Sequence, residues 1–100
     1  MMVLITYDVN VTTNSGKKRL GKVARQCKNY GQRVQNSVFE CLVDPTQFAV
    51  LKSKLEEIID PGTDSLRYYF LGSNWEKHVE HHGAKGTYNP EGLMIIDANP

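Results

Sequence analysis

The chain has 100 residues, of which 40% are hydrophobic and 23% charged, and its formal net charge is +1. This length suits one domain, and the composition excludes a disordered chain. No apolar run approaches the roughly 20 residues that a membrane-spanning helix needs. The initial MMVLI lacks the basic segment and cleavage site of a signal peptide. We therefore expect a cytoplasmic protein whose small core would gain stability from dimerisation.

The first segment, MVLITYDV, predicts a strand because β-branched and aromatic residues dominate it. Polar character arrives only at Thr6 and Asp8, and the following NVTTNSG is typical of a turn. Asp8 therefore ends a core strand, with no basic residue before Lys17. The simplest role for such a carboxylate is to cap the turn that follows it.

A basic helix is expected from about residue 15 to residue 30. Leu20, Val23, Ala24 and Cys27 form one apolar stripe at helical spacing, and Gly31 is a plausible stop. No acidic residue lies between Asp8 and Glu40. That interval holds seven of the twelve lysines and arginines: Lys17, Lys18, Arg19, Lys22, Arg25, Lys28 and Arg33. The pattern fits a surface that faces a polyanion, and equally a solvated helix face.

The second half of the domain repeats the strand and helix order. RVQNSVFECLV predicts one strand, or two with a break near Asn36 and Ser37. DPTQ predicts a helix start, with Asp44 as N-cap, Pro45 at N1 and Gln47 at N3. The expected buried stripe of this helix consists of Phe48, Leu51, Leu55 and Ile58 or Ile59. PG at 61–62 would end it, and SLRYYFLG predicts the next strand.

The remaining segment, NWEKHVEHHGAKGTYNPEG, has no sustained period, and GLMIID is a short apolar run. The order of elements predicts an α+β fold, a ferredoxin-like βαββαβ sandwich with its helices on one face of an antiparallel sheet. The other face needs cover, which a homodimer packing sheet on sheet would supply. We expect a domain over 1–83 and a tail over 84–100, whose apolar strand would add to the partner's sheet.

Most catalytic motifs are missing from the sequence. There is no phosphate-binding Walker loop, GxSxG or HExxH, and Cys27 and Cys41 lack CxxC spacing, so we expect two reduced, buried thiols. His78, His81 and His82 would share one side of a helix and could bind zinc. We favour surface or capping histidines there, since HHG is typical of a helix end.

Asp8 has a second interpretation. A single aspartate is a poor site for Mg²⁺, which requires several oxygen ligands. If two copies of the chain meet on a two-fold axis, two Asp8 carboxylates could share a Mg²⁺ or Mn²⁺ ion and act on a phosphodiester. Tyr7 and Phe39 could stack on bases near Asp8, although their positions in predicted strands favour the core.

In this order, the residues resemble the CRISPR-associated protein 2 family. The resemblance rests on LITYDV, KKRLGKVARQC, NYGQRVQNSVFECLVD and DSLRYYFLG, and it extends from Met1 to about Gly83. It implies a ferredoxin-like homodimer that binds duplex DNA and assembles with the integrase subunit during spacer acquisition.

The resemblance also implies site residues. Several members are described as Mg²⁺- or Mn²⁺-dependent endonucleases acting on RNA or DNA, and Asp8 matches their metal-binding and catalytic aspartate, contributed by both subunits. The residues expected to contact nucleic acid are Tyr7, Lys17, Lys18, Arg19, Arg33, Ser37 and Phe39. A purely structural DNA-binding scaffold without nuclease activity is the alternative, because members can serve spacer acquisition without this aspartate.

Overall fold

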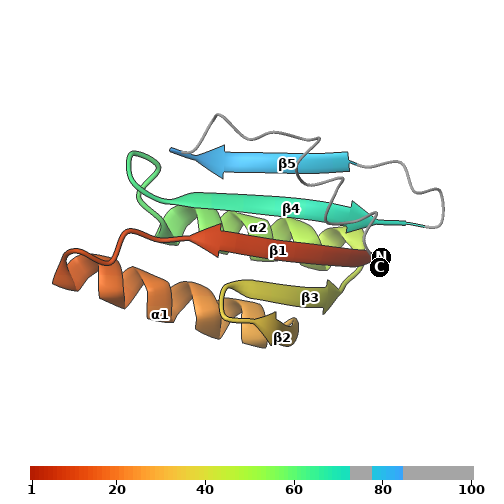
Figure 1. Cartoon of the computed structure of the whole chain (residues 1–100). Helices are drawn as coiled ribbons and strands as arrows, with labels where there is room; N and C mark the ends of the chain where they lie inside the picture. Colours follow the sequence, from red (N-terminus) through yellow and green to blue (C-terminus); the bar gives the residue numbers. More distant parts are fainter. Residues whose placement is uncertain (73–77, 85–100) are drawn as a thin grey trace.

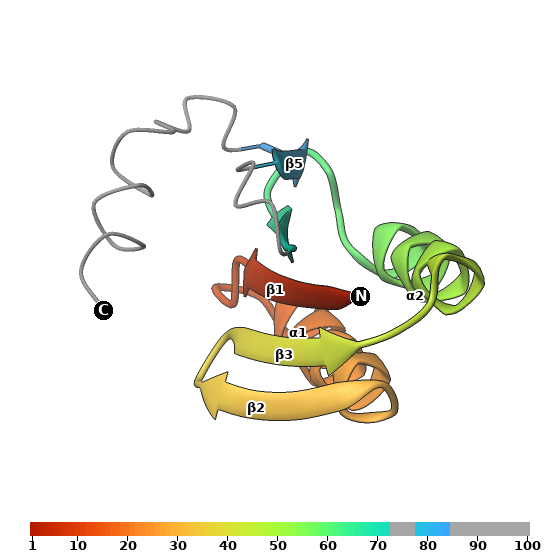
Figure 2. The ribbon, with the colours of Figure 1, turned by 90° about the vertical axis from the view of Figure 1, so that its right-hand side faces the viewer.

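Two helices and five strands make up the part of the chain that the computed structural model describes, residues 1–72 and 78–84. In chain order they are β1 (Met2–Asp8), α1 (Asn14–Lys28), β2 (Gly31–Gln35), β3 (Val38–Leu42), α2 (Pro45–Ile58), β4 (Ser65–Leu71) and β5 (His78–Gly83). The strands form one sheet in the order β2-β3-β1-β4-β5, and every neighbouring pair is antiparallel. Both helices cover the same face of the sheet (Figure 1 and Figure 2).

This arrangement confirms the predicted α+β, ferredoxin-like sandwich. The segment 33–43 contains a hairpin, and its turn lies at Asn36 and Ser37 as one of the two alternatives required. The first strand, β1, lies in the middle of the sheet and pairs with β3 on one side and β4 on the other. Its backbone is therefore held along both edges.

The core lies between β1, β3, β4 and the two helices. Because side chains alternate across a strand, Val3, Ile5 and Tyr7 are buried beneath the helices, whereas Met2, Leu4 and Thr6 on the other face are partly exposed. The helices contribute Val23, Cys27, Phe48, Leu51 and Leu55 to this core. The two predicted apolar stripes thus meet the sheet at the expected face.

Side chains cap the starts of both helices, and the start of α2 follows its sequence signal. The hydroxyl of Thr13 accepts a hydrogen bond from the Gly16 N–H at 3.1 Å and caps α1. Asp44 and Gln47 form a reciprocal capping box at α2, with bonds of 2.7 Å and 3.0 Å. The expected stop at Gly31 is wrong, because α1 ends at Lys28 and Gly31 begins β2.

The fifth strand was not predicted. The interpretation of HHG as a helix end is wrong, because residues 78–83 form β5 and pair with β4 along six register positions. Adjacent residues of a strand lie on opposite faces, so His81 and His82 do not share a side. Polar residues on both faces of β5 hide the two-residue period that a half-buried strand shows.

The two cysteines are buried and free, as expected. Burial raises the pKa of the Cys27 thiol to about 12 and that of Cys41 to about 11. Neither helix of the described chain has the length and apolarity to cross a membrane. The predicted boundary at 83–84 and the apolar run at 92–97 concern a tail that, from residue 85, lies outside the described residues.

Two glycines of α1 should respond in opposite ways to alanine. Gly21→Ala is expected to raise the free energy of unfolding by about 0.5–1 kcal/mol, because alanine favours a helix interior and the new methyl meets only ordinary contacts. Gly16→Ala should lower it, because its Cβ would collide with the Asn10 backbone carbonyl. Urea unfolding of both variants measures the difference, and stabilisation by both would contradict the close approach of residue 10 to α1.

Candidate functional site

Asp8 is the last residue of β1, and it is exposed. It alternates with the buried Tyr7, so it belongs to the sheet face that the helices leave uncovered. In the register of the sheet, Asp8 lies opposite Ser65 of β4. The central strand therefore presents a carboxylate at the end of a rigid support.

The carboxylate of Asp8 is a hard oxygen donor of the kind that Mg²⁺ and Mn²⁺ prefer. Within residues 1–72 and 78–84, no group of three or more His, Cys, Asp or Glu side chains could hold a metal ion. Within the described residues of one copy, the Asp8 carboxylate is therefore not part of a cluster of three or more potential metal ligands. Its exposure leaves it accessible to a ligand or to a second chain.

Tyr7 and Phe39 are core residues, which is the interpretation that the sequence favoured. Tyr7 is 5% exposed and Phe39 is fully buried, and their rings stack with centroids 6.2 Å apart. Burial, helped by Cys27, raises the pKa of Tyr7, although the Arg33 guanidinium opposes the shift. In this structure neither ring is exposed enough to stack on a base, and both belong to the core on the helix-covered side of the sheet.

Ser37 and Arg33 lie around the same aromatic pair. The carbonyl of Ser37 accepts the Tyr7 N–H at 3.1 Å and so ties the β2–β3 turn to the end of β1. Arg33 lies opposite Phe39 in the register, and its guanidinium carbon is 5.2 Å from the centre of that ring. Arg33 is exposed, on the opposite face of the sheet from Asp8.

The three predicted cations of α1 divide into two kinds. Lys17 and Lys18 are exposed. Arg19 is half-buried, and its Nε donates to Oδ2 of the buried Asp64 at 2.8 Å. The first two side chains are therefore free to face a polyanion, whereas the guanidinium of Arg19 is directed into the protein.

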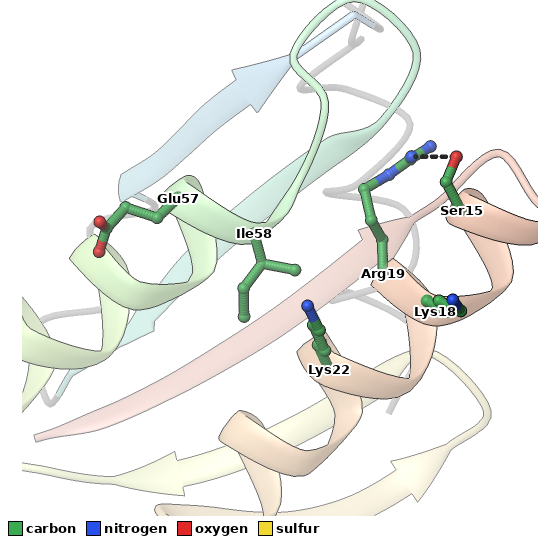
Figure 3. Close-up of a pocket in the computed structure, with 6 residues that line it drawn as sticks. All are labelled: Ser15, Lys18, Arg19, Lys22, Glu57 and Ile58. Atoms are coloured by element: carbon green, nitrogen blue, oxygen red, sulfur yellow. Dashed lines mark hydrogen bonds between the residues drawn. The ribbon is translucent and has the colours of Figure 1, made fainter.

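A groove runs between α1 and α2 on the helical side of the molecule. Its volume is about 510 Å³, and its lining consists of Ser15, Lys18, Arg19, Lys22, Glu57 and Ile58. Lys22 on α1 and Ile58 on α2 face each other across it, while Arg19 donates to the Ser15 hydroxyl at 3.3 Å (Figure 3). Because Arg19 is paired with Asp64, Lys18 and Lys22 against Glu57 leave the groove with a net positive charge.

The sequence did not single out two residues of this region. Lys22 follows Lys18 by four positions and so shares its side of α1, a spacing that could have identified it. Asp64 precedes a strand by one residue, and only the fold shows that it is buried and bonded to Arg19. The structure brings the α1 cations to the helical layer and leaves Asp8 on the other face of the sheet.

Comparison with known proteins identifies the family. Residues 1–79 match the family model for the CRISPR associated protein Cas2. The chain is 58% identical over 96 residues to the CRISPR-associated endoribonuclease Cas2 of Chlorobaculum tepidum, covering 96% of this chain and all of the relative. It is 57% identical, with the same coverage, to the CRISPR-associated endonuclease Cas2 of Halalkalibacterium halodurans. The chain belongs to the CRISPR-associated Cas2 family.

A solved structure agrees with this assignment. The crystal structure of Streptococcus pyogenes Cas2 at pH 6.5 superposes with a TM-score of 0.69 at 60% sequence identity. The match covers 76% of this chain and 92% of that chain. The ferredoxin-like sandwich described above is therefore the fold of an experimentally solved relative.

Phe39→Ala tests the core role of this ring. We expect the free energy of unfolding to fall by about 3–5 kcal/mol, because the fully buried ring leaves a cavity beneath β1. Val34→Ala, on the exposed side of the same hairpin, serves as the control and should change it by about 0.5 kcal/mol or less. Chemical denaturation measures both values. An unchanged stability of Phe39→Ala would contradict the core role of this ring and favour its predicted role in contacting nucleic acid.

Proposed function

We propose that the chain acts in the cytoplasm as a homodimeric protein of CRISPR adaptation. It binds nucleic acid, preferentially duplex DNA, assembles with the integrase subunit, and hydrolyses phosphodiester bonds as a Mg²⁺- or Mn²⁺-dependent endonuclease. The observation that carries the nuclease proposal is Asp8, exposed at the end of the central strand on the uncovered sheet face. The names of the relatives, an endoribonuclease and an endonuclease, support the same activity.

The uncovered face of the sheet supports the homodimer. Leu42 is 72% exposed and Leu71 is 42% exposed, and both lie opposite Met2 in the register. These side chains share one face, because residues directly opposite in a sheet project to the same side. Packing of a second copy against this face would bury them and bring a second Asp8 to the same side of the assembly.

The metal proposal follows from the donor chemistry of Asp8. An exposed carboxylate fits a hard divalent cation, and a second copy would double the donors without requiring any further acidic residue. A divalent ion held there would stabilise charge on the phosphate and lower the pKa of a bound water. The role of Asp8 itself is to bind and orient that ion, and the pairing of β1 on both edges keeps its backbone fixed.

The Asp8→Asn variant tests the nuclease proposal. Cleavage of RNA and DNA in Mg²⁺ or Mn²⁺ should fall by about 100-fold or more, because even partners of metal ligands contribute about 10–100-fold. Product formation on labelled RNA and DNA measures the rate, and EDTA should abolish it in the wild type. Glu40→Gln removes a different exposed carboxylate, one that lies nearer the other end of the same sheet face, and should retain activity.

Circular dichroism should show the wild-type fold in both variants, since each replaced side chain is exposed. Equal cleavage by wild type and Asp8→Asn, prepared identically, would assign the activity to a contaminating nuclease and reject the proposal.

The cationic groove favours a second function, that of a DNA-binding scaffold without nuclease activity. Lys18 and Lys22 line it from adjacent turns of α1, and Lys17 lies exposed beside them. Exposed lysines at this spacing can follow the phosphates of a duplex without reading its sequence. DNA binding along the groove is also compatible with a nuclease site at Asp8, because the groove and Asp8 occupy opposite sides of the sheet.

Salt dependence tests this contact. The double variant Lys18→Ala, Lys22→Ala should bind duplex DNA more weakly, and its plot of log affinity against log salt should be less steep by about 0.9 for each phosphate contact removed. Fluorescence anisotropy of a labelled duplex over a range of NaCl concentrations gives the slope. Lys54→Ala, an exposed lysine of α2 that does not line the groove, is the matched control. A double variant with the slope of the control would exclude the groove from the DNA path.

A further inference from the structure

Asp64 is a fully buried carboxylate whose two oxygens accept hydrogen bonds from separate parts of the chain. Oδ1 accepts from the Asn10 N–H at 2.9 Å and from the Thr63 hydroxyl at 3.1 Å. Oδ2 accepts from Arg19 Nε at 2.8 Å and from the Asp60 N–H at 2.9 Å. The side chain is 0% exposed, so these donors replace water completely.

The charged form of Asp64 is the stable one. Burial alone would raise its pKa, but the bonds from Arg19, Asp60, Asn10 and Thr63 outweigh burial and hold the pKa below the ordinary value of 3.8. The carboxylate therefore stays ionised at neutral pH. Replacing a buried ion pair by apolar residues often costs a protein nothing, so stability alone does not explain why a charge is placed here.

The donors join three segments around Asp8. Asn10 belongs to the connection between β1 and α1, Arg19 to α1, and Asp60 to the turn that follows α2. The connection is also closed locally, because the Asn10 side chain accepts from the N–H and hydroxyl of Thr12 at 2.9 Å and 2.7 Å. The Asp64 carboxylate thus ties two segments together: the loop that follows Asp8, and helix α1, which carries the lysines.

The backbone around Asp8 contacts the segment Asp64–Ser65 in two places. On one side, Asp8 pairs in register with Ser65, the residue that follows Asp64. On the other, the backbone N–H of Asn10, two residues after Asp8, is held by the Asp64 carboxylate. The end of β5 joins the same point, since the Ala84 N–H donates to the Asp64 carbonyl at 2.8 Å.

We propose that Asp64 is a positioning residue for the Asp8 site: it fixes the β1–α1 connection and so orients the Asp8 carboxylate toward a divalent cation. This inference rests on the proposed function. Arg19 belongs to the positioning device through its bond to Asp64, rather than to the surface that contacts phosphate. Its role differs in this respect from those of Lys18 and Lys22.

The test compares Asp64→Asn with the wild type. The amide nitrogen cannot accept a hydrogen bond, so one pair of donors loses its acceptor. We expect Mn²⁺ affinity, measured by water proton relaxation, to weaken about tenfold. Amide hydrogen exchange at residues 9–13 should accelerate at the same time. Both measurements are made below the melting temperatures of all variants.

Asp60→Asn is the matched control. It is the same acid-to-amide change in the same turn, and the Asp60 side-chain oxygen accepts from the Gly62 N–H at 2.9 Å, a bond that an asparagine oxygen can also accept. It should leave Mn²⁺ affinity and loop exchange unchanged. If Asp64→Asn does not fold, Arg19→Lys removes the Nε donor while keeping the charge, and should weaken Mn²⁺ binding in the same direction.

The outcomes separate this inference from the proposed function. Mn²⁺ binding that is lost in Asp8→Asn but unchanged in folded Asp64→Asn or Arg19→Lys would overturn the positioning role and keep the metal site. A wild type with no Asp8-dependent Mn²⁺ binding would reject the metal site itself. Exchange at residues 9–13 then decides whether Asp64 fixes the connection: faster exchange in the variant supports that part, and unchanged exchange overturns it.

Discussion

The pairing of β1 on both of its edges is the constraint on which the rest of the molecule depends. It places this strand in the middle of the sheet, between β3 and β4. Alternation then sends Val3, Ile5 and Tyr7 into the core and leaves Asp8 on the uncovered face. Apolar packing beneath the strand and a carboxylate above its end are therefore two results of one geometry. The helices hold the strand from below and leave the other face for chemistry or for a partner.

The charge of α1 is divided between support and surface. Arg19 turns inward to a buried carboxylate, whereas Lys17 and Lys18 remain exposed. A run of cations in sequence is thus not a run of equivalent contacts. The pairing of Arg19 with Asp64 leaves one positive charge fewer on the surface, but it ties the basic helix to the turn before β4. The exposed lysines are therefore carried by a helix whose position is fixed relative to the sheet.

Local patterns predicted the elements whose signals lie within a few residues. The capping box at Asp44 and Gln47 and the apolar stripe through Val23 and Cys27 are of this kind. Two features could not be predicted from the sequence, because they depend on contacts between segments that are distant in the chain. The strand β5 has polar residues on both faces and depends on pairing with β4, and Asp64 acquires its partners only when three distant segments meet. Asp8 was identified as a candidate, but its face of the sheet required the structure.

The two-residue period of β1 has a consequence for how this protein tolerates change. Sliding the strand by one position against β3 and β4 would exchange the faces of Tyr7 and Asp8. A carboxylate would enter the apolar core while an aromatic ring emerged into water, and both movements are unfavourable. The same contacts that stabilise the sheet therefore also disfavour any register of β1 other than the native one. A single-residue deletion near the beginning of β1 would shift the register of every later residue of the strand, including Asp8. An insertion in a loop would leave that register unchanged.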